Sequence, residues 1–139
     1  MTIASEDSTS LVLDLAIERS IDLSALRGQI TTTLSDVDED DRYDVLLVVS
    51  ELVSNVLDHT QGPGRLRLLR TRARHEVVIE IDDSSPLEPV RGQSRLSDVR
   101  GRGIVMVDEV AKEWGTRALP GGGKTVYAKL RCAGAGPLP

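Results

Sequence analysis

A carboxylate and an amide stand four residues apart in the mostly apolar segment Val45–Thr60, VLLVVSELVSNVLDHT. At about 100° per residue, Glu51 and Asn55 lie one helical turn apart and can reach the same ligand. Ser54 and Asp58 share their face, with His59 at its edge, and the opposite face gathers Val49, Leu52, Val53, Val56 and Leu57. Such a pair suits a hydrated divalent cation, or a general base beside a metal ligand. Taken alone, the pattern favours an ordinary solvated helix face, so other motifs must decide.

Asp83 lies where the predicted strand Val77–Ile81 ends, a usual place for a binding carboxylate in an open α/β sheet. Strand alternation puts Asp83 on the core side with Ile79 and Ile81, and the adjacent Asp82 on the outer side. Asp83 is therefore the better candidate for a ligand contact. The alternative is a turn cap, because Asp and Ser both favour turns.

Two glycine-containing segments resemble phosphate-binding loops. Gly101–Gly103 precedes an apolar segment that opens with Ile104, which predicts backbone amides at a helix N-terminus. A loop that enters a core helix explains that segment equally well. Gly123–Thr125 is not a P-loop, because the position of the required first glycine holds Ala118 and a strand follows the threonine.

The composition predicts one soluble domain. A chain of 139 residues fits a single core, expected over residues 10–132, with a flexible start at 1–9 and a disordered tail at 133–139. The net charge of −5 and the 2% aromatic content argue against a nucleic-acid surface. No apolar run approaches the roughly 20 residues that span a bilayer, and the acidic start is unlike a signal peptide. We therefore expect a cytoplasmic protein, with the lone Cys132 a spare thiol beside the tail.

The elements that must position these residues follow from hydrophobic spacing. Ser10–Ile17 reads as a strand, and Asp22 caps a helix with the buried stripe Leu23, Leu26, Ile30 and Leu34. The acidic run Asp36–Asp41 precedes the helix Val45–Thr60 as cap and solvated loop rather than as a metal site. Four further strands are expected in two pairs: a hairpin of Arg65–Thr71 with Val77–Ile81, and Glu113–Leu119 joined by a turn to Lys124–Arg131. The polar stretch between the two pairs predicts a lid or binding loop, followed by a helix after Gly103.

In this order, the motifs resemble the GHKL ATPase superfamily, which has the Bergerat fold of gyrase-type ATPases and histidine kinases. Glu51–Asn55 with His59 matches the N box, Asp83–Pro86 the first glycine box and Gly101–Ile104 the second. Gly122–Val126 matches the last strand. More narrowly, the chain looks like the small serine kinases that act as bacterial anti-sigma factors. Such proteins often have Asp-x-Ser-Pro in the first glycine box, where gyrase-type proteins carry a glycine instead of a serine.

The resemblance implies a role for each matched position. Asn55 would coordinate the Mg²⁺ that bridges the ATP phosphates, and Glu51 would act as the base that takes a proton from serine or water. Asp83 would accept the adenine amino group, supported by Thr125 directly or through water. The remaining nucleotide-binding positions are Ser85, Gly101, Arg102, Gly103 and Ile104.

The loop Leu87–Arg100 would close over the phosphates as a lid, and it is expected to be the least ordered internal segment without ligand. The arginines that could neutralise phosphate charge are Arg91, Arg95, Arg100 and Arg102.

The resemblance also implies a fold and two alternative functions. The fold is a two-layer α/β sandwich, a mixed and mostly antiparallel sheet with three main helices on one face. The first function is an ATP-dependent serine/threonine protein kinase that binds a sigma factor and phosphorylates a small antagonist protein. The second is an ATP-gated protein-binding module with little or no turnover. A homodimer is expected in either case, with no nucleic acid and no membrane as partner.

Overall fold

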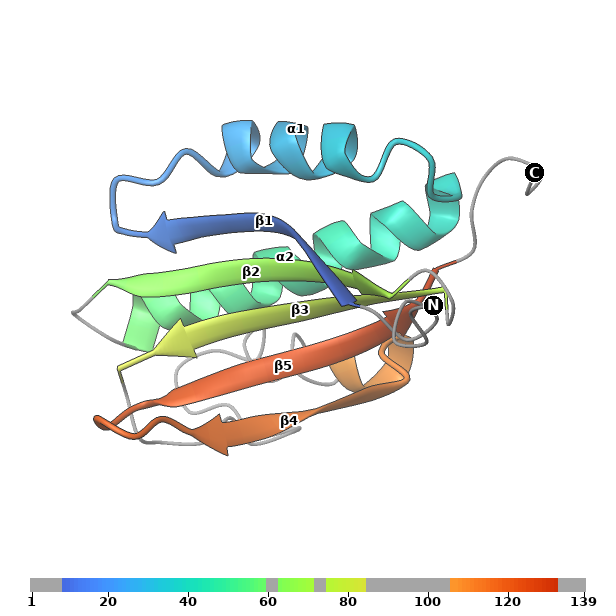
Figure 1. The fold of residues 1–139 in the computed structure, drawn as a ribbon. Coiled ribbons are helices and arrows are strands. Elements are labelled where there is room, and N and C mark those ends of the chain that lie inside the picture. Colours follow the sequence, from blue (N-terminus) through green and yellow to red (C-terminus); the bar gives the residue numbers. More distant parts are fainter. Residues whose placement is uncertain (1–8, 60–62, 72–74, 85–105, 133–139) are drawn as a thin grey trace, which may run out of the picture.

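The structure, a computed structural model, describes residues 9–59, 63–71, 75–84 and 106–132. In chain order its elements are β1 (Thr9–Ile17), α1 (Leu23–Thr33), α2 (Glu39–His59), β2 (Gly64–Thr71), β3 (Glu76–Asp83), β4 (Glu113–Ala118) and β5 (Lys124–Arg131). Residues 106–110 are also helical. Figure 1 shows one twisted sheet with α1 and α2 along the same face, and this two-layer arrangement confirms the expected fold class.

The five strands form one sheet in the order β1-β2-β3-β5-β4. The two expected strand pairs, β2 with β3 and β4 with β5, are both present and antiparallel. The remaining pairings, β1 with β2 and β3 with β5, are antiparallel as well. The sheet expected to be mixed is therefore antiparallel at every pairing among the described strands. β3 and β5 lie side by side although about 40 residues separate them in sequence.

The core lies between the sheet and the helices. Alternate residues of the central strands, such as Leu66, Leu68, Ile79 and Ala128, are fully buried on the side that faces the helices. Of the expected stripe of α1, Leu26, Ile30 and Leu34 are buried, and Leu23 is partly buried against the core. Asp22 caps that helix, because its carboxylate accepts a hydrogen bond of 3.1 Å from the backbone N–H of Ala25.

The central helix α2 begins at Glu39, earlier than the expected start at Val45. The expected acidic loop is thus partly helix, because Glu39, Asp40 and Asp41 form the first turn, where negative charge is favourable. Just before it, the Asp38 carboxylate accepts a hydrogen bond of 3.1 Å from the backbone N–H of Asp40. The buried face of α2 then extends over Val45, Val48, Val49, Leu52, Val53 and Val56.

Asp36, the first residue of the acidic run, has a structural role. Its carboxylate accepts two hydrogen bonds, of 2.8 and 2.9 Å, from the guanidinium of the buried Arg70 on β2. This bidentate pair ties the segment before α2 to the inner face of the sheet.

Cys132 belongs to the core rather than to the tail, which corrects the expectation of a spare thiol. Cys132 is 4% exposed, and its backbone N–H donates a hydrogen bond to the carbonyl oxygen of His75. Burial raises the pKa of its thiol to about 12. Because the thiolate is the reactive form, the folded chain holds this cysteine in its unreactive form at neutral pH.

Several sequence expectations fall outside the described residues. These are the lid Leu87–Arg100, the flexible start over residues 1–8 and the tail 133–139. Thr9, expected within the flexible start, instead opens β1 and pairs with Thr71. Within the described part of the chain, no helix is both long and apolar enough to cross a membrane.

Candidate functional site

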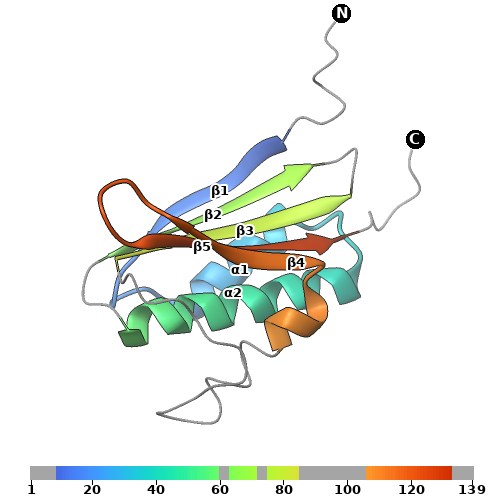
Figure 2. The same cartoon turned by 90° about the horizontal axis from the view of Figure 1, so that it is seen from below.

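The last turns of α2, the end of β3 and the start of β5 lie at one end of the domain. Figure 2 shows the C-terminal end of α2 below the sheet at this end, where β3 finishes and β5 begins, and in Figure 1 the same end of α2 lies behind the strands. Gly64 packs between α2 and β3: a methyl group at Gly64 would lie 2.6 Å from the Asp82 carbonyl oxygen and 3.0 Å from a Val56 methyl. Val56, which follows Asn55, and Asp82, which precedes Asp83, therefore both border Gly64.

Asp83 points inward, as strand alternation predicts. Its side chain is 6% exposed, and it follows Ile79 and Ile81 on the face that packs against the helices. The Nζ atom of Lys124 donates a hydrogen bond of 3.1 Å to Asp83 Oδ2. The Lys124 side chain is 8% exposed, so the structure places a buried ion pair where the sequence predicts a ligand-binding carboxylate.

The backbone beside this pair leaves no room for a side chain. Gly123 has φ +83°, and a methyl group there would overlap the carbonyl oxygen of Asp83. Two hydrogen bonds of 3.1 Å between Leu119 and the glycines 122 and 123 close the turn that precedes β5. The tight turn therefore fixes the position of Lys124 opposite Asp83.

We expect Gly123→Ala to lower the free energy of unfolding by about 1–3 kcal/mol, the usual cost of backbone strain. Gly121→Ala is the matched control, because no atom lies within 4 Å of its added methyl group and its φ is not positive. The control should change stability by less than about 0.5 kcal/mol. Urea unfolding of both variants measures the difference, and equal stability would show that the turn tolerates a side chain.

Asp82 points the other way, into an ion-pair network on the helix-free face. Its carboxylate accepts hydrogen bonds of 3.0 and 2.8 Å from the guanidinium of Arg67, and that interaction holds its pKa below the ordinary value. It also accepts one of 2.7 Å from the Thr125 hydroxyl. Thr125 thus contacts Asp82 and not Asp83, because strand pairing sets Thr125 opposite Asp82. The residue beside Asp83 is Lys124.

Glu51 and Asn55 lie on α2 four residues apart, so their side chains stand one turn apart as the sequence predicts. Both are half-buried, between the core face and the exposed Asp58. Among the described residues, no three His, Cys, Asp or Glu side chains gather closely enough to hold a metal ion. A single amide ligand nevertheless fits Mg²⁺, which proteins often bind through one or two side chains plus phosphates and water.

The other expected nucleotide-binding positions lie outside the described residues. They are Ser85, Gly101, Arg102, Gly103 and Ile104. The helical residues 106–110 that follow them are fixed to the sheet by a hydrogen bond of 2.9 Å from Trp114 Nε1 to Asp108 Oδ1, and by the buried Val107.

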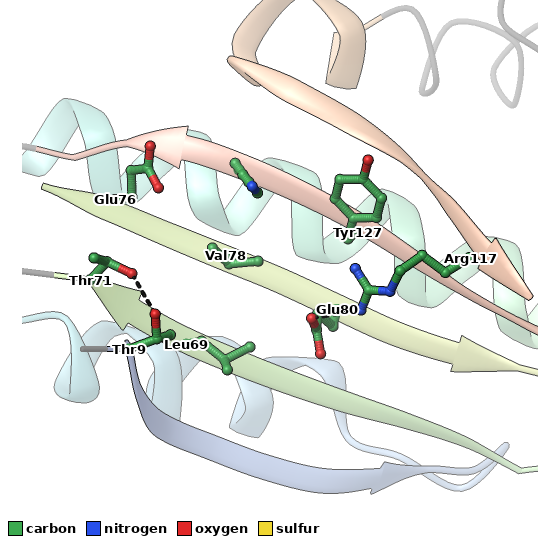
Figure 3. A pocket seen from close by; sticks show the side chains of 9 residues that line it. Thr9, Leu69, Thr71, Glu76, Val78, Glu80, Arg117 and Tyr127 are labelled. Carbon is green, nitrogen blue, oxygen red and sulfur yellow. Dashed lines mark hydrogen bonds and ion pairs between the residues drawn. The ribbon is translucent and has the colours of Figure 1, made fainter. Parts of the chain in front are cut away.

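A hollow of about 260 Å³, here named the outer hollow, lies on the helix-free face (Figure 3). At one end the hydroxyls of Thr9 and Thr71 lie 3.0 Å apart, and at the other Arg117 stacks over the Tyr127 ring at 5.1 Å. The Glu80 carboxylate accepts hydrogen bonds from Arg67 and Arg117. This hollow contains no sequence-predicted site residue, and the sheet separates it from Asp83.

Lys124 is the residue of this site that sequence reasoning missed. Strand alternation in the sequence could have revealed its inward direction, because Val126, Ala128 and Leu130 form the buried face of β5 and Lys124 continues that row. The register between β3 and β5, which no local pattern reveals, is what places it opposite Asp83.

Comparison with known protein families supplies the last observation. The family described as "Histidine kinase-like ATPase domain" matches residues 19–130, which include α1, α2 and β2 to β4 and nearly all of β5. No curated protein matches this chain closely enough to serve as a relative. The family match supports ATP as the ligand and ATP-dependent chemistry as the activity. The chain belongs to the histidine kinase-like ATPase domain family.

Proposed function

We propose that this protein is an ATP-dependent serine/threonine protein kinase of the anti-sigma-factor type. It binds ATP with Mg²⁺, phosphorylates a small antagonist protein and sequesters a sigma factor. The observation that carries the nucleotide site is the buried, inward-pointing Asp83 at the end of β3, beside the helix that presents Glu51 and Asn55. The kinase assignment follows from the retained carboxylate Glu51 and from the resemblance of the motifs.

In this proposal, Asp83 binds the base of the nucleotide. A buried carboxylate is an acceptor only, so it selects an exocyclic amino group such as that of adenine. Thr125 supports the base contact indirectly, since its hydroxyl donates to Asp82 on the other face of the strand. Ser85, Gly101, Arg102, Gly103 and Ile104 complete the nucleotide contacts.

Phosphoryl transfer then requires a base and a metal ligand from α2. Glu51 takes the proton of the attacking serine hydroxyl, whose oxygen forms a bond to the γ-phosphorus as the bond to the β–γ bridging oxygen breaks and ADP leaves. Asn55, one turn later, offers its amide oxygen to Mg²⁺, which neutralises the phosphate charge when bound. The carboxylate and the amide are thus placed for different tasks in one step.

The partners and location follow the same resemblance. We propose a cytoplasmic homodimer that binds a sigma factor in one state and the antagonist in another. The acidic net charge of −5 fits protein partners better than nucleic acid.

A second function, an ATP-gated binding module with little or no kinase turnover, remains as the alternative. It needs the same contacts to the nucleotide and does not need Glu51 as a base.

Incubation with ATP labelled at the γ-phosphate, together with candidate antagonist proteins, tests the proposal. Label on a serine or threonine of an antagonist supports the kinase. ATP-dependent partner binding without any label would favour the binding module.

A further inference from the structure

The Asp83–Lys124 pair is buried at the end of the inward row of two central strands. The side chains are 6% and 8% exposed, and Oδ2 and Nζ lie 3.1 Å apart. The next inward residues of β3 and β5 are Ile81 and Val126, which belong to the core. The row of inward side chains therefore changes from apolar to charged at the end of the sheet where α2 also finishes.

Stability alone is a weak reason for such a pair. Removing two charges from water costs several kcal/mol per ion, and apolar residues of similar size often stabilise a protein at least as well. The backbone is also held close here, because Gly123 approaches the Asp83 carbonyl too tightly for any side chain. These contacts fix an ammonium beside the carboxylate that is proposed to bind the base.

We propose that Lys124 is a second residue that contacts the base and helps to determine its identity. In this arrangement Asp83 accepts from the 6-amino group of adenine, while Lys124 Nζ donates to the adjacent ring nitrogen N1. The inference rests on the proposed function, since it takes the Asp83 end of β3 as the nucleotide site.

The chemistry of the two side chains matches that edge of adenine. A carboxylate carries several lone pairs and an ammonium three N–H donors, so each group can take part in more than one hydrogen bond at a time. Adenine presents a donor and an acceptor on neighbouring atoms of its Watson–Crick edge, the edge that proteins commonly use to read an unpaired base. Guanine in the same pose presents a carbonyl oxygen to Asp83 and an N–H to Lys124, so both contacts become repulsive.

A cycle of one protein change and one ligand change tests the contact. Titration calorimetry measures the affinity of wild type and Lys124→Met for Mg-ATP and for Mg-1-deaza-ATP, which has a C–H in place of N1. Wild type should lose about 10-fold in affinity on the ligand change, the usual worth of a hydrogen bond to a charged group. Lys124→Met should bind both nucleotides alike, and Lys124→Arg should keep part of the difference. Lys129→Met is the control, because Lys129 lies on the same strand but faces Glu113 on the outer side.

Lys124→Met removes the ion-pair partner of Asp83 and can therefore lower the stability of the fold. The same comparison is therefore repeated in a background in which the carboxylate is also removed. Asp83→Asn and the double variant Asp83→Asn/Lys124→Met allow the same comparison with the buried carboxylate removed. The ligand difference should persist in Asp83→Asn and vanish in the double variant, with folding of each checked by circular dichroism.

Three outcomes would overturn the inference. An undiminished difference between the nucleotides in Lys124→Met would show that Lys124 does not contact N1. Tighter ATP binding by Lys124→Met would show that Lys124 competes with the base for Asp83. A wild-type chain that binds neither nucleotide refutes the proposed function itself, and so is distinguishable from the other two.

Discussion

Replacing Glu51 by Gln is expected to lower phosphoryl transfer to the antagonist by about 10²–10⁴-fold, the usual worth of a positioned general base. Phosphoryl transfer has a loose transition state and can depend less on its base, so the lower end of this range is compatible with the proposal. Nucleotide affinity should hardly change, because in the proposed mechanism Glu51 contacts the attacking hydroxyl and not the bound ATP. Single-turnover transfer measures the rate, and calorimetry with Mg-ATP measures the affinity.

Asn55→Ala is the comparison for this result. It removes the proposed Mg²⁺ ligand one turn further along α2, so it should reduce both Mg²⁺-dependent affinity and turnover. Binding of the partner in the presence of ATP should survive Glu51→Gln, since only the chemistry is lost. Equal transfer rates in wild type and Glu51→Gln would exclude Glu51 as the base.

Asp83→Asn is expected to weaken ATP binding by about 10- to 100-fold, because the amide would no longer give the adenine amino group the charged acceptor that the proposed site provides. Asp82→Asn should have a much smaller effect. Its carboxylate lies on the opposite face of β3 and is paired with Arg67. Calorimetric titration of both variants with Mg-ATP gives the comparison.

The interpretation of Asp83→Asn requires a measurement of stability, because the change also removes the anionic partner of Lys124. Breaking a buried ion pair commonly costs 3–5 kcal/mol. Thermal unfolding therefore accompanies each titration, which is made well below the midpoint of the less stable variant. Unchanged affinity in both folded variants would refute the adenine assignment, and a loss confined to Asp82→Asn would move it to the neighbouring carboxylate.

Much of the fold could be predicted because local patterns determine it. The spacing of Leu26 and Ile30 marks the buried stripe of α1. Asp is a common residue at the N-cap of a helix, and Asp22 caps α1. The start of α2 could not be located, because the acidic residues from Glu39 onward have no apolar period and suit a loop equally well. In the structure Glu39, Asp40 and Asp41 form the first turn of α2.

The candidate site was predictable only in part for a related reason. Alternation along β3 is local, so the inward direction of Asp83 could be predicted. The neighbour of Asp83 depends on the pairing of β3 with β5, and this pairing joins segments about 40 residues apart. One residue of register decides between Thr125 and Lys124, and a shift of one residue moves a side chain to the other face of the sheet. The resemblance implies a role for Thr125 beside the base, and the register places Lys124 directly opposite Asp83.

The most direct test of the account is a map of backbone amide chemical shifts during titration with Mg-ATP. The largest changes should fall at the end of α2 near Asn55, at Asp83 and at Lys124, where three elements meet at one end of the sheet. Residues of the outer hollow, such as Leu69 and Val78, should change little. Changes confined to that hollow, or no changes at saturating Mg-ATP, would contradict the placement of the nucleotide at the end of β3.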